Sequence, residues 1–138
     1  MQSLFAESPA HKALFDKIKS FCLSFPGTSE RLSHGAPSFF IDNKLSFVQY
    51  RVNHHGDGRI ALWCAAPPGV QSLLVESSPE IFFIPAYVGH LGWVGMRLDG
   101  HVDWEEISSV IGDAYLTRSP KKYKDQTKQI KQSELPEQ

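Results

Sequence analysis

The sequence predicts an α+β domain in which an antiparallel sheet packs against N- and C-terminal helices. Near both ends of the 138-residue chain, apolar residues recur at steps of three and four, the spacing of an amphipathic helix. Between them lie short runs rich in Phe, Val and Tyr, separated by Gly, Pro, Asn and Asp, which is typical of strands joined by tight turns. A chain of this length can bury about two thirds of its unfolded surface, so it does not need a disulfide or a metal ion to fold.

The first helix is expected from Ser8 to Ser24. Ser8 can cap the first amides and Pro9 suits the first helical position. Pro26-Gly27 ends the helix and turns the chain. One apolar stripe runs along this helix, formed by Leu14, Ile18, Phe21, Cys22 and Phe25.

The period then changes to that of strands, which we expect at 30–34, 38–41, 45–51 and 59–65. Asp42-Asn43-Lys44 is expected to form a tight hairpin turn, because Asn accepts a positive φ. Residues 53–58 form a second turn. Successive strands joined by tight turns predict an antiparallel meander.

The second half adds a short helix at 70–77 and two strands, at 82–84 and 92–98. The last helix starts at Asp103, where Glu106 completes a capping-box-like pattern. Ser119-Pro120 ends it. We therefore expect one domain over residues 1–122 and a polar, flexible tail over 123–138.

Cys22 and Cys64 each have apolar neighbours, which favours two reduced, buried thiols over a disulfide. No CxxC or Cys/His ligand spacing is present, so we expect no metal site. No signal peptide and no apolar run of about 20 residues is found, so we expect a cytoplasmic protein without a membrane span.

The formal net charge of −1 is unevenly distributed. From Arg118 onward there are six basic and three acidic residues, whereas the rest has eight basic and twelve acidic ones. The folded body is thus mildly acidic and the tail basic. A general nucleic-acid binder usually has a clearly basic folded face, which these totals do not indicate.

Three motifs that carry catalysis or phosphate binding are absent: there is no GxSxG, GxGxxG or phosphate-binding P-loop. A helix N-terminus accounts for Glu105-Glu106. The sequence therefore favours a protein that is not an enzyme and uses no cofactor. His54-His55, beside Asp57, is expected to be a solvated turn, because adjacent residues rarely bind one ion. His34 is expected to be partly buried.

Basic residues at turns and near the C-terminus give a first functional hypothesis. Arg51 and Arg59 flank one turn and are expected to face each other across it, making its tip locally positive. Such tips can lie along nucleic-acid phosphates, or they can simply keep turns and edges soluble. The candidate nucleic-acid-binding residues are Lys44, Arg51, Arg59, Lys121, Lys122 and Lys124.

Three blocks resemble the MmcQ/YjbR family. They are Phe25-Pro26-Gly27-Thr28-Ser29-Glu30-Arg31, His34-Gly35-Ala36-Pro37-Ser38-Phe39 and Asn43-Lys44-Leu45-Ser46-Phe47. Later pieces agree, namely Pro85-Ala86-Tyr87, Gly92-Trp93-Val94, Ala114-Tyr115-Leu116 and Pro120-Lys121-Lys122.

This resemblance implies a CyaY-like (YjbR-type) fold, with helices on one face of an antiparallel sheet. Members are commonly described as DNA-binding proteins with a double-wing arrangement, and many have no assigned function. The family supplies no catalytic residues to carry over. Frataxins share the fold type and bind iron through an acidic first helix, whereas here Asp16 lies among Lys12, Lys17 and Lys19, which argues against iron.

Two partner classes follow. The first is duplex DNA, bound without catalysis. The alternative is a small molecule or a protein, bound near the Pro85–Trp93 loop in a pocket lined by His34, Tyr87 and Trp93. The sequence leaves the oligomeric state open.

Overall fold

The computed structural model describes residues 8–100 and 102–124. Six strands form one antiparallel sheet in the order β1-β2-β3-β4-β6-β5. The elements in chain order are α1 (Pro9–Leu23), β1 (Thr28–Ser33), β2 (Ala36–Ile41), β3 (Leu45–Val52), η1 (His54–Gly56), β4 (Ile60–Cys64), α2 (Val70–Ser77), β5 (Phe82–Phe83), η2 (Gly89–Leu91), β6 (Val94–Arg97) and α3 (Trp104–Arg118). The expected α+β fold and its meander are confirmed.

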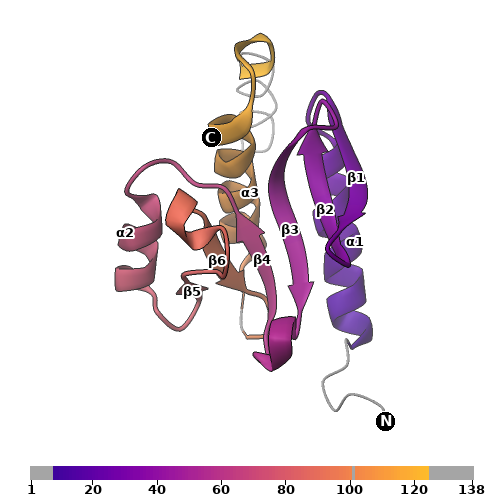
Figure 1. Cartoon of the computed structure of the whole chain (residues 1–138). Coiled ribbons are helices and arrows are strands. Elements are labelled where there is room, and N and C mark those ends of the chain that lie inside the picture. The colour runs from indigo at the N-terminus through magenta and orange to yellow at the C-terminus, as the bar shows by residue number, and fades with distance from the viewer. Residues whose placement is uncertain (1–7, 101, 125–138) are drawn as a thin grey trace, which may run out of the picture.

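The two long helices, α1 and α3, lie on the same face of the sheet (Figure 1). The short helix α2 lies beside the β5–β6 edge, and the loop that contains η2 passes over the opposite face (Figure 1). Gln71 of α2 holds this loop by donating to the carbonyl oxygens of Gly89 and Trp93, at 2.8 and 2.5 Å. No helix in the described part of the chain is long and apolar enough to cross a membrane.

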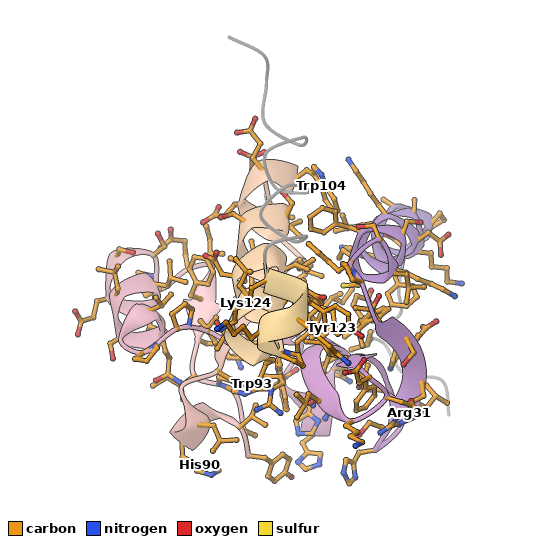
Figure 2. The ribbon with its side chains drawn as sticks, turned by 90° about the horizontal axis from the view of Figure 1, so that it is seen from above. Arg31, His90, Trp93, Trp104, Tyr123 and Lys124 are labelled. Atoms are coloured by element: carbon orange, nitrogen blue, oxygen red, sulfur yellow. The ribbon has the colours of Figure 1, made fainter. Side chains whose placement is uncertain are left out.

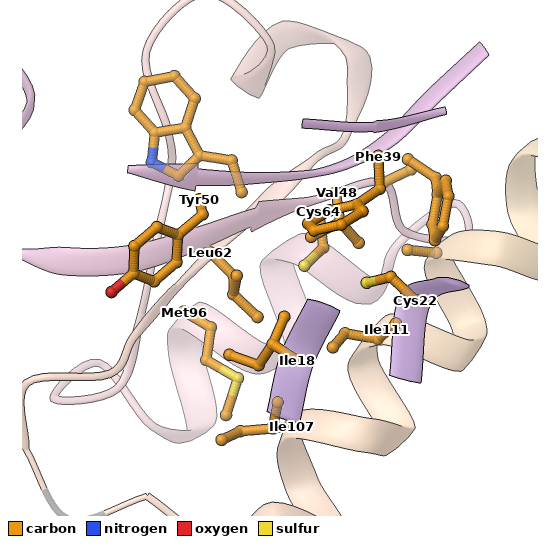
Figure 3. Close-up of a cluster of buried hydrophobic side chains, with 14 of the residues drawn as sticks. Ile18, Cys22, Phe39, Val48, Tyr50, Leu62, Cys64, Met96, Ile107 and Ile111 are labelled. Carbon is orange, nitrogen blue, oxygen red and sulfur yellow. The ribbon is translucent and has the colours of Figure 1, made fainter. Parts of the chain in front are cut away.

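The hydrophobic core fills the space between the sheet and the two long helices (Figure 3). Tyr50, Leu62 and Met96 are cross-strand neighbours in register, and they face Ile18 of α1 and Ile107 of α3. All five side chains are at most 4% exposed. Burial of a side chain of this size contributes roughly 1.5–3 kcal/mol, so these two helices fix the position of the sheet.

Both cysteines are free and buried in this core, as expected. Burial raises the pKa of the Cys22 and Cys64 thiols well above its ordinary range. They therefore act as small apolar side chains.

The turn after α1 is fixed by the last helix. The ring of Phe25 stacks on that of Tyr115, with centroids 4.7 Å apart, and the Tyr115 hydroxyl donates to the carbonyl oxygen of Pro26 at 2.6 Å. The Phe25-Pro26-Gly27 segment thus ends α1 and also anchors α3.

The described chain continues in a helical turn over residues 121–124 after α3. Tyr123, the first residue of the expected tail, packs against the core as a partly buried side chain. Residues 125–138, which make up the rest of that tail, lie outside the described residues.

Candidate functional site

The outer face of the sheet, opposite the core, carries polar and aromatic side chains along β3 and β4. Gln49 pairs with Trp63 and Arg51 with Ala61 in the strand register, so all four project from the face that α1 and α3 leave uncovered. Arg51 is only 8% exposed and Trp63 only 2%. A charged side chain buried to this extent normally has a carboxylate partner.

Two adjoining hollows open over these residues, with volumes of about 450 and 540 Å³. Both are lined by His34 from the β1–β2 turn, by Arg51, and by His54 and His55 from η1. The larger one is closed on its far side by Tyr87 and Val88 of the η2 loop, and its remaining lining residues are Ser33, Gln49 and Trp63. We call the two together the Arg51 pocket. A hollow of this size can take a small organic molecule.

Arg51 has no acidic partner in this pocket. Among the described residues, no carboxylate lies within ion-pair distance of its guanidinium. Nη2 instead donates to Oε1 of Gln49 at 2.8 Å, and the guanidinium carbon lies 4.5 Å from the centre of the Trp63 indole ring. Burial lowers the pKa of Arg51 from its ordinary value, but arginine remains charged throughout the physiological range.

Three polar atoms in the pocket lack hydrogen-bond partners. Of the four such buried side-chain atoms in the described part of the chain, three belong to residues lining the pocket, namely Arg51 Nε, Trp63 Nε1 and His54 Nε2. The first two can only donate. A buried donor without a partner costs about 1–3 kcal/mol. Unpaired donors beside a buried positive charge make the pocket suited to an anionic acceptor.

Aromatic rings surround the opening. The His54 and His55 rings are stacked at 4.0 Å, and the Tyr87 ring stands nearly perpendicular to both, at 90° and 81°. The other side of His54 packs edge-on against Trp63 at 4.8 Å. Tyr87 is 65% exposed, so a face of its ring remains available to a ligand.

Backbone strain is concentrated at the same place. Six described non-glycine residues have a positive φ, and four of them, His34, Asn53, His55 and Tyr87, line the pocket. Asn tolerates this conformation, whereas for a bulky residue such as Tyr it is unfavourable. Strained residues of this kind cost about 1–3 kcal/mol each and cluster at functional sites. The pocket wall is thus built from turns held in costly conformations.

Comparison with known proteins identifies the family. The family model described as YjbR matches residues 23–117. The chain belongs to the YjbR family. This confirms the resemblance seen in the sequence blocks.

A solved relative shares the fold of this YjbR protein. The crystal structure of Deinococcus radiodurans protein DR2400, which carries a DUF419 domain, matches with a TM-score of 0.65 and 16% identity, over 83% of this chain and 87% of that one. At this identity the likeness establishes the fold and nothing more. The search of curated proteins finds no significant match.

The candidate nucleic-acid-binding residues of this YjbR domain divide into two groups. Lys44, Lys121, Lys122 and Lys124 are exposed where the β2–β3 turn meets the turn after α3, and Figure 2 views the molecule from this end, with Tyr123 and Lys124 labelled on that turn. Arg51 and Arg59 belong to the β3–β4 turn, at the other end of β3 (Figure 1). β3 has eight residues, and an extended strand of that length spans about 26 Å. The two groups of basic residues therefore lie far apart.

The two arginines also differ from the expected exposed pair facing each other across a turn. In the register Arg51 is opposite Ala61, and the backbone of Arg59 bonds to Asn53 instead. Arg51 is buried, whereas Arg59 is half-exposed, 3.8 Å from Asp57 and stacked over Phe83. The expected positive hairpin tip is therefore wrong for Arg51, because the η1 turn and the Tyr87 loop cover its strand.

The alternative pocket residues are brought together only in part. His34 and Tyr87 line the larger hollow, but Trp93 is 4% exposed and does not line it. His34 itself is exposed, contrary to the expected partial burial, because its left-handed backbone turns it outward.

The expected solvated turn at His54-His55 is wrong for His54. His55 is exposed, but His54 is half-buried against Trp63. The side chain of His54 lies close enough to Arg51 for the two charges to interact. This contact depends on the left-handed backbone of the turn between them, which the sequence does not indicate. No group of three or more His, Cys, Asp or Glu within the described ranges could hold a metal ion.

Proposed function

We propose that this YjbR protein is a non-enzymatic binding module whose ligand is a small organic anion held in the Arg51 pocket. The proposal depends on one observation: Arg51 is only 8% exposed, and its guanidinium has no carboxylate partner in the described chain. Burying an isolated charge is costly, and an anionic ligand would offset that cost.

The surroundings of Arg51 support an anion over a cation. Carboxylate and phosphate oxygens only accept hydrogen bonds, whereas Arg51 Nε and Trp63 Nε1 can only donate them. The acidic residue nearest in sequence is Asp57, which is at ion-pair distance from Arg59. A cationic ligand would find no acceptor charge in the pocket lining.

Two-dimensional NMR with a panel of small carboxylates and phosphates tests the proposal. We expect saturable shifts of backbone amides in residues 33–37, 49–55 and 85–89, with no comparable shifts for neutral amides of the same shape. Shifts spread evenly over the surface, or none with any anion, would reject it.

Variants at Arg51 make the test specific. Arg51→Met removes the charge and should abolish saturable binding, and Arg51→Lys keeps the charge but loses the planar fork, so binding should weaken by about tenfold or more. The matched control is Arg31→Met, which removes an exposed charge on the same face that stacks on Phe40 at 3.7 Å. Arg31 does not line either hollow of the pocket. Equal loss with both Met variants would contradict a role for Arg51.

A second candidate, binding of duplex DNA, is favoured by the lysine end. This surface consists of Lys44, Lys121, Lys122 and Lys124, and the one carboxylate bonded to it in the described chain is Asp42, 3.1 Å from Lys122 Nζ. Four exposed cations within one small area are suited to phosphate contacts. Arg51 and Arg59, at the other end of β3, would not take part.

Fluorescence anisotropy of a labelled duplex, titrated at low and then moderate salt, tests this candidate. We expect affinity that falls steeply with salt, and replacement of all four lysines by Ala should reduce the slope of log affinity against log salt by about 3.6. Arg59→Ala, at the far end, is the control and should leave the slope unchanged. No binding at low salt, or binding indifferent to salt, rejects DNA as the partner.

A further inference from the structure

We propose that the ligand of the Arg51 pocket is an aromatic acid: a flat ring that carries one carboxylate or phosphate group, with the anion at Arg51 and the ring beside Tyr87 and His55. This inference rests on the proposed function and narrows the ligand class. It is based on the juxtaposition of two features, a fixed guanidinium at the floor of the pocket and exposed aromatic rings at its opening.

The floor is organised before any ligand arrives. The Trp63 ring lies under the Arg51 guanidinium at 4.5 Å, and Gln49 accepts from Nη2 at 2.8 Å. These contacts hold the plane of the guanidinium and occupy one of its edges. The planar guanidinium of Arg51 still has N–H donors free, and their geometry matches a carboxylate or phosphate better than a single point charge does. Because its orientation is fixed before binding, the entropic cost of binding is reduced.

The opening of the pocket is built from π-systems. Tyr87 is 65% exposed and has a φ of +63°, and its ring centroid lies 6.2 Å from that of the exposed His55. Gln71 ties the loop that carries Tyr87 to α2 by two hydrogen bonds. An exposed aromatic side chain kept in a strained backbone conformation beside a hollow suits contact with a ring.

Size and polarity agree with one or two rings. The larger hollow has a volume of about 540 Å³, within the range of pockets that enclose small ligands. Its apolar lining comes from Trp63, Tyr87 and Val88, and among the described residues no carboxylate lines either hollow. An aliphatic acid would satisfy Arg51 but would make no stacking contact at the opening.

Four probe molecules of similar size distinguish the contribution of the anionic group from that of the aromatic ring. Calorimetric titration with benzoate, phenyl phosphate, cyclohexanecarboxylate and benzamide should show binding of one or both aromatic anions, and their ratio identifies the preferred head group. Cyclohexanecarboxylate should bind about 2- to 10-fold more weakly, because it lacks the aromatic ring contacts that add to burial. Benzamide should not bind measurably.

The possible failures are distinguishable. If cyclohexanecarboxylate binds as well as benzoate, the aromatic inference is overturned and the proposed anion-binding function stands. If benzamide binds as well as benzoate, or if none of the four probes binds, both are overturned.

Variants of one loop give a second, independent test. Tyr87→Asn keeps a residue that tolerates the left-handed backbone and removes the ring. It should weaken benzoate about tenfold and leave cyclohexanecarboxylate unchanged. Leu91→Asn is the matched control, because Leu91 lies in the same loop, is 63% exposed and does not line the pocket. Equal effects of the two variants, or equal loss of both acids in Tyr87→Asn, would overturn the role of the ring.

Discussion

The hydroxyl of Tyr123 donates a hydrogen bond of 2.7 Å to Oδ1 of Asp42, joining residues 81 positions apart. The other oxygen of the same carboxylate lies 3.1 Å from Lys122 Nζ. Asp42 sits at the β2–β3 turn with a φ of +51°. The helical turn after α3 is thereby fastened to this hairpin, so the lysine end is a defined surface up to Lys124.

Removing the hydroxyl should loosen this connection. Tyr123→Phe keeps the ring and deletes the donor to Asp42, so we expect the free energy of unfolding to fall by about 1 kcal/mol. Urea denaturation measures it as a lower midpoint at unchanged slope. A double-mutant cycle with Asp42→Ala should show coupling between the two changes. Strictly additive effects would contradict a direct interaction.

Gly27 should tolerate no side chain, for two separable reasons. Its φ is +75°, and a Cβ would lie 2.7 Å from the Tyr123 ring. The matched control is Gly56, which has the same φ of +75° and no heavy atom within 4 Å of such a Cβ. Gly56→Ala should cost about 1 kcal/mol of stability from backbone strain alone. Gly27→Ala should cost at least about 1 kcal/mol more, from overpacking.

Thermal or urea unfolding of both glycine variants gives the comparison. Repeating Gly27→Ala in a Tyr123→Ala background should reduce its cost to that of Gly56→Ala, because the ring that it strikes is gone. Equal costs for the two glycine variants in the original background would show that Tyr123 does not occupy this position.

The Asp42 carboxyl should titrate below its usual range. The hydrogen bond from Tyr123, followed by that from Lys122, lowers the pKa of Asp42 from its ordinary value of 3.8. Folding is therefore stabilised above pH 3.8, and this contribution is lost as the pH falls through the depressed pKa. A carbon-detected NMR titration should find the low pKa in the original protein and a higher one in Tyr123→Phe. An unchanged Asp42 pKa in the variant would contradict the ordering of causes.

Local patterns were sufficient to predict most of this fold. The Ser8 cap, the Pro26-Gly27 break and the strand-like runs of β3 and β4 depend on neighbouring residues, and each α-helix and strand in the described chain overlaps a range expected from such a pattern. The 3-10 helices η1 and η2 lie where the sequence predicts only a turn and a loop.

The exception to these local patterns is the register shift between β2 and β3, where Phe39 is opposite Val48 and Phe40 is opposite Ser46, so β3 has one extra residue. The adjacent Phe47 and Val48 therefore both lie in the core. Phe39 and Phe40 keep opposite faces, with Phe39 in the core and Phe40 under Arg31.

The candidate site could not be predicted in the same way. Arg51 has the sequence appearance of a residue at a solvated turn, and only the left-handed backbone of Asn53 and His55, together with the distant Tyr87 loop, encloses it. His34 and Tyr87 are expected in the alternative pocket because loops often carry function, and nothing in the sequence links them to Arg51. Long-range enclosure depends on tertiary packing, which a single sequence does not display.

Protonation of His54 should destabilise the folded protein. Burial, then the charges of His55 and Arg51, lower the pKa of His54 from its ordinary value of 6.5, against a smaller opposing effect of Asp57. Below pH 6.5 the unfolded chain takes up a proton that the folded chain does not. Stability is therefore greatest above pH 6.5 and declines as the pH falls from 6.5 toward the depressed pKa.

Comparison of the original protein with His54→Gln isolates this effect from the other titrating groups of the pocket, His34, His55 and Tyr87. Urea midpoints measured between pH 5 and pH 8 should fall more steeply at the acid end for the original protein than for the variant. If the two curves of urea midpoint against pH were parallel, the charge of Arg51 and the burial of His54 would have no effect on the pKa of His54. Any anion bound at Arg51 should flatten the original curve, because it would favour the protonated imidazole.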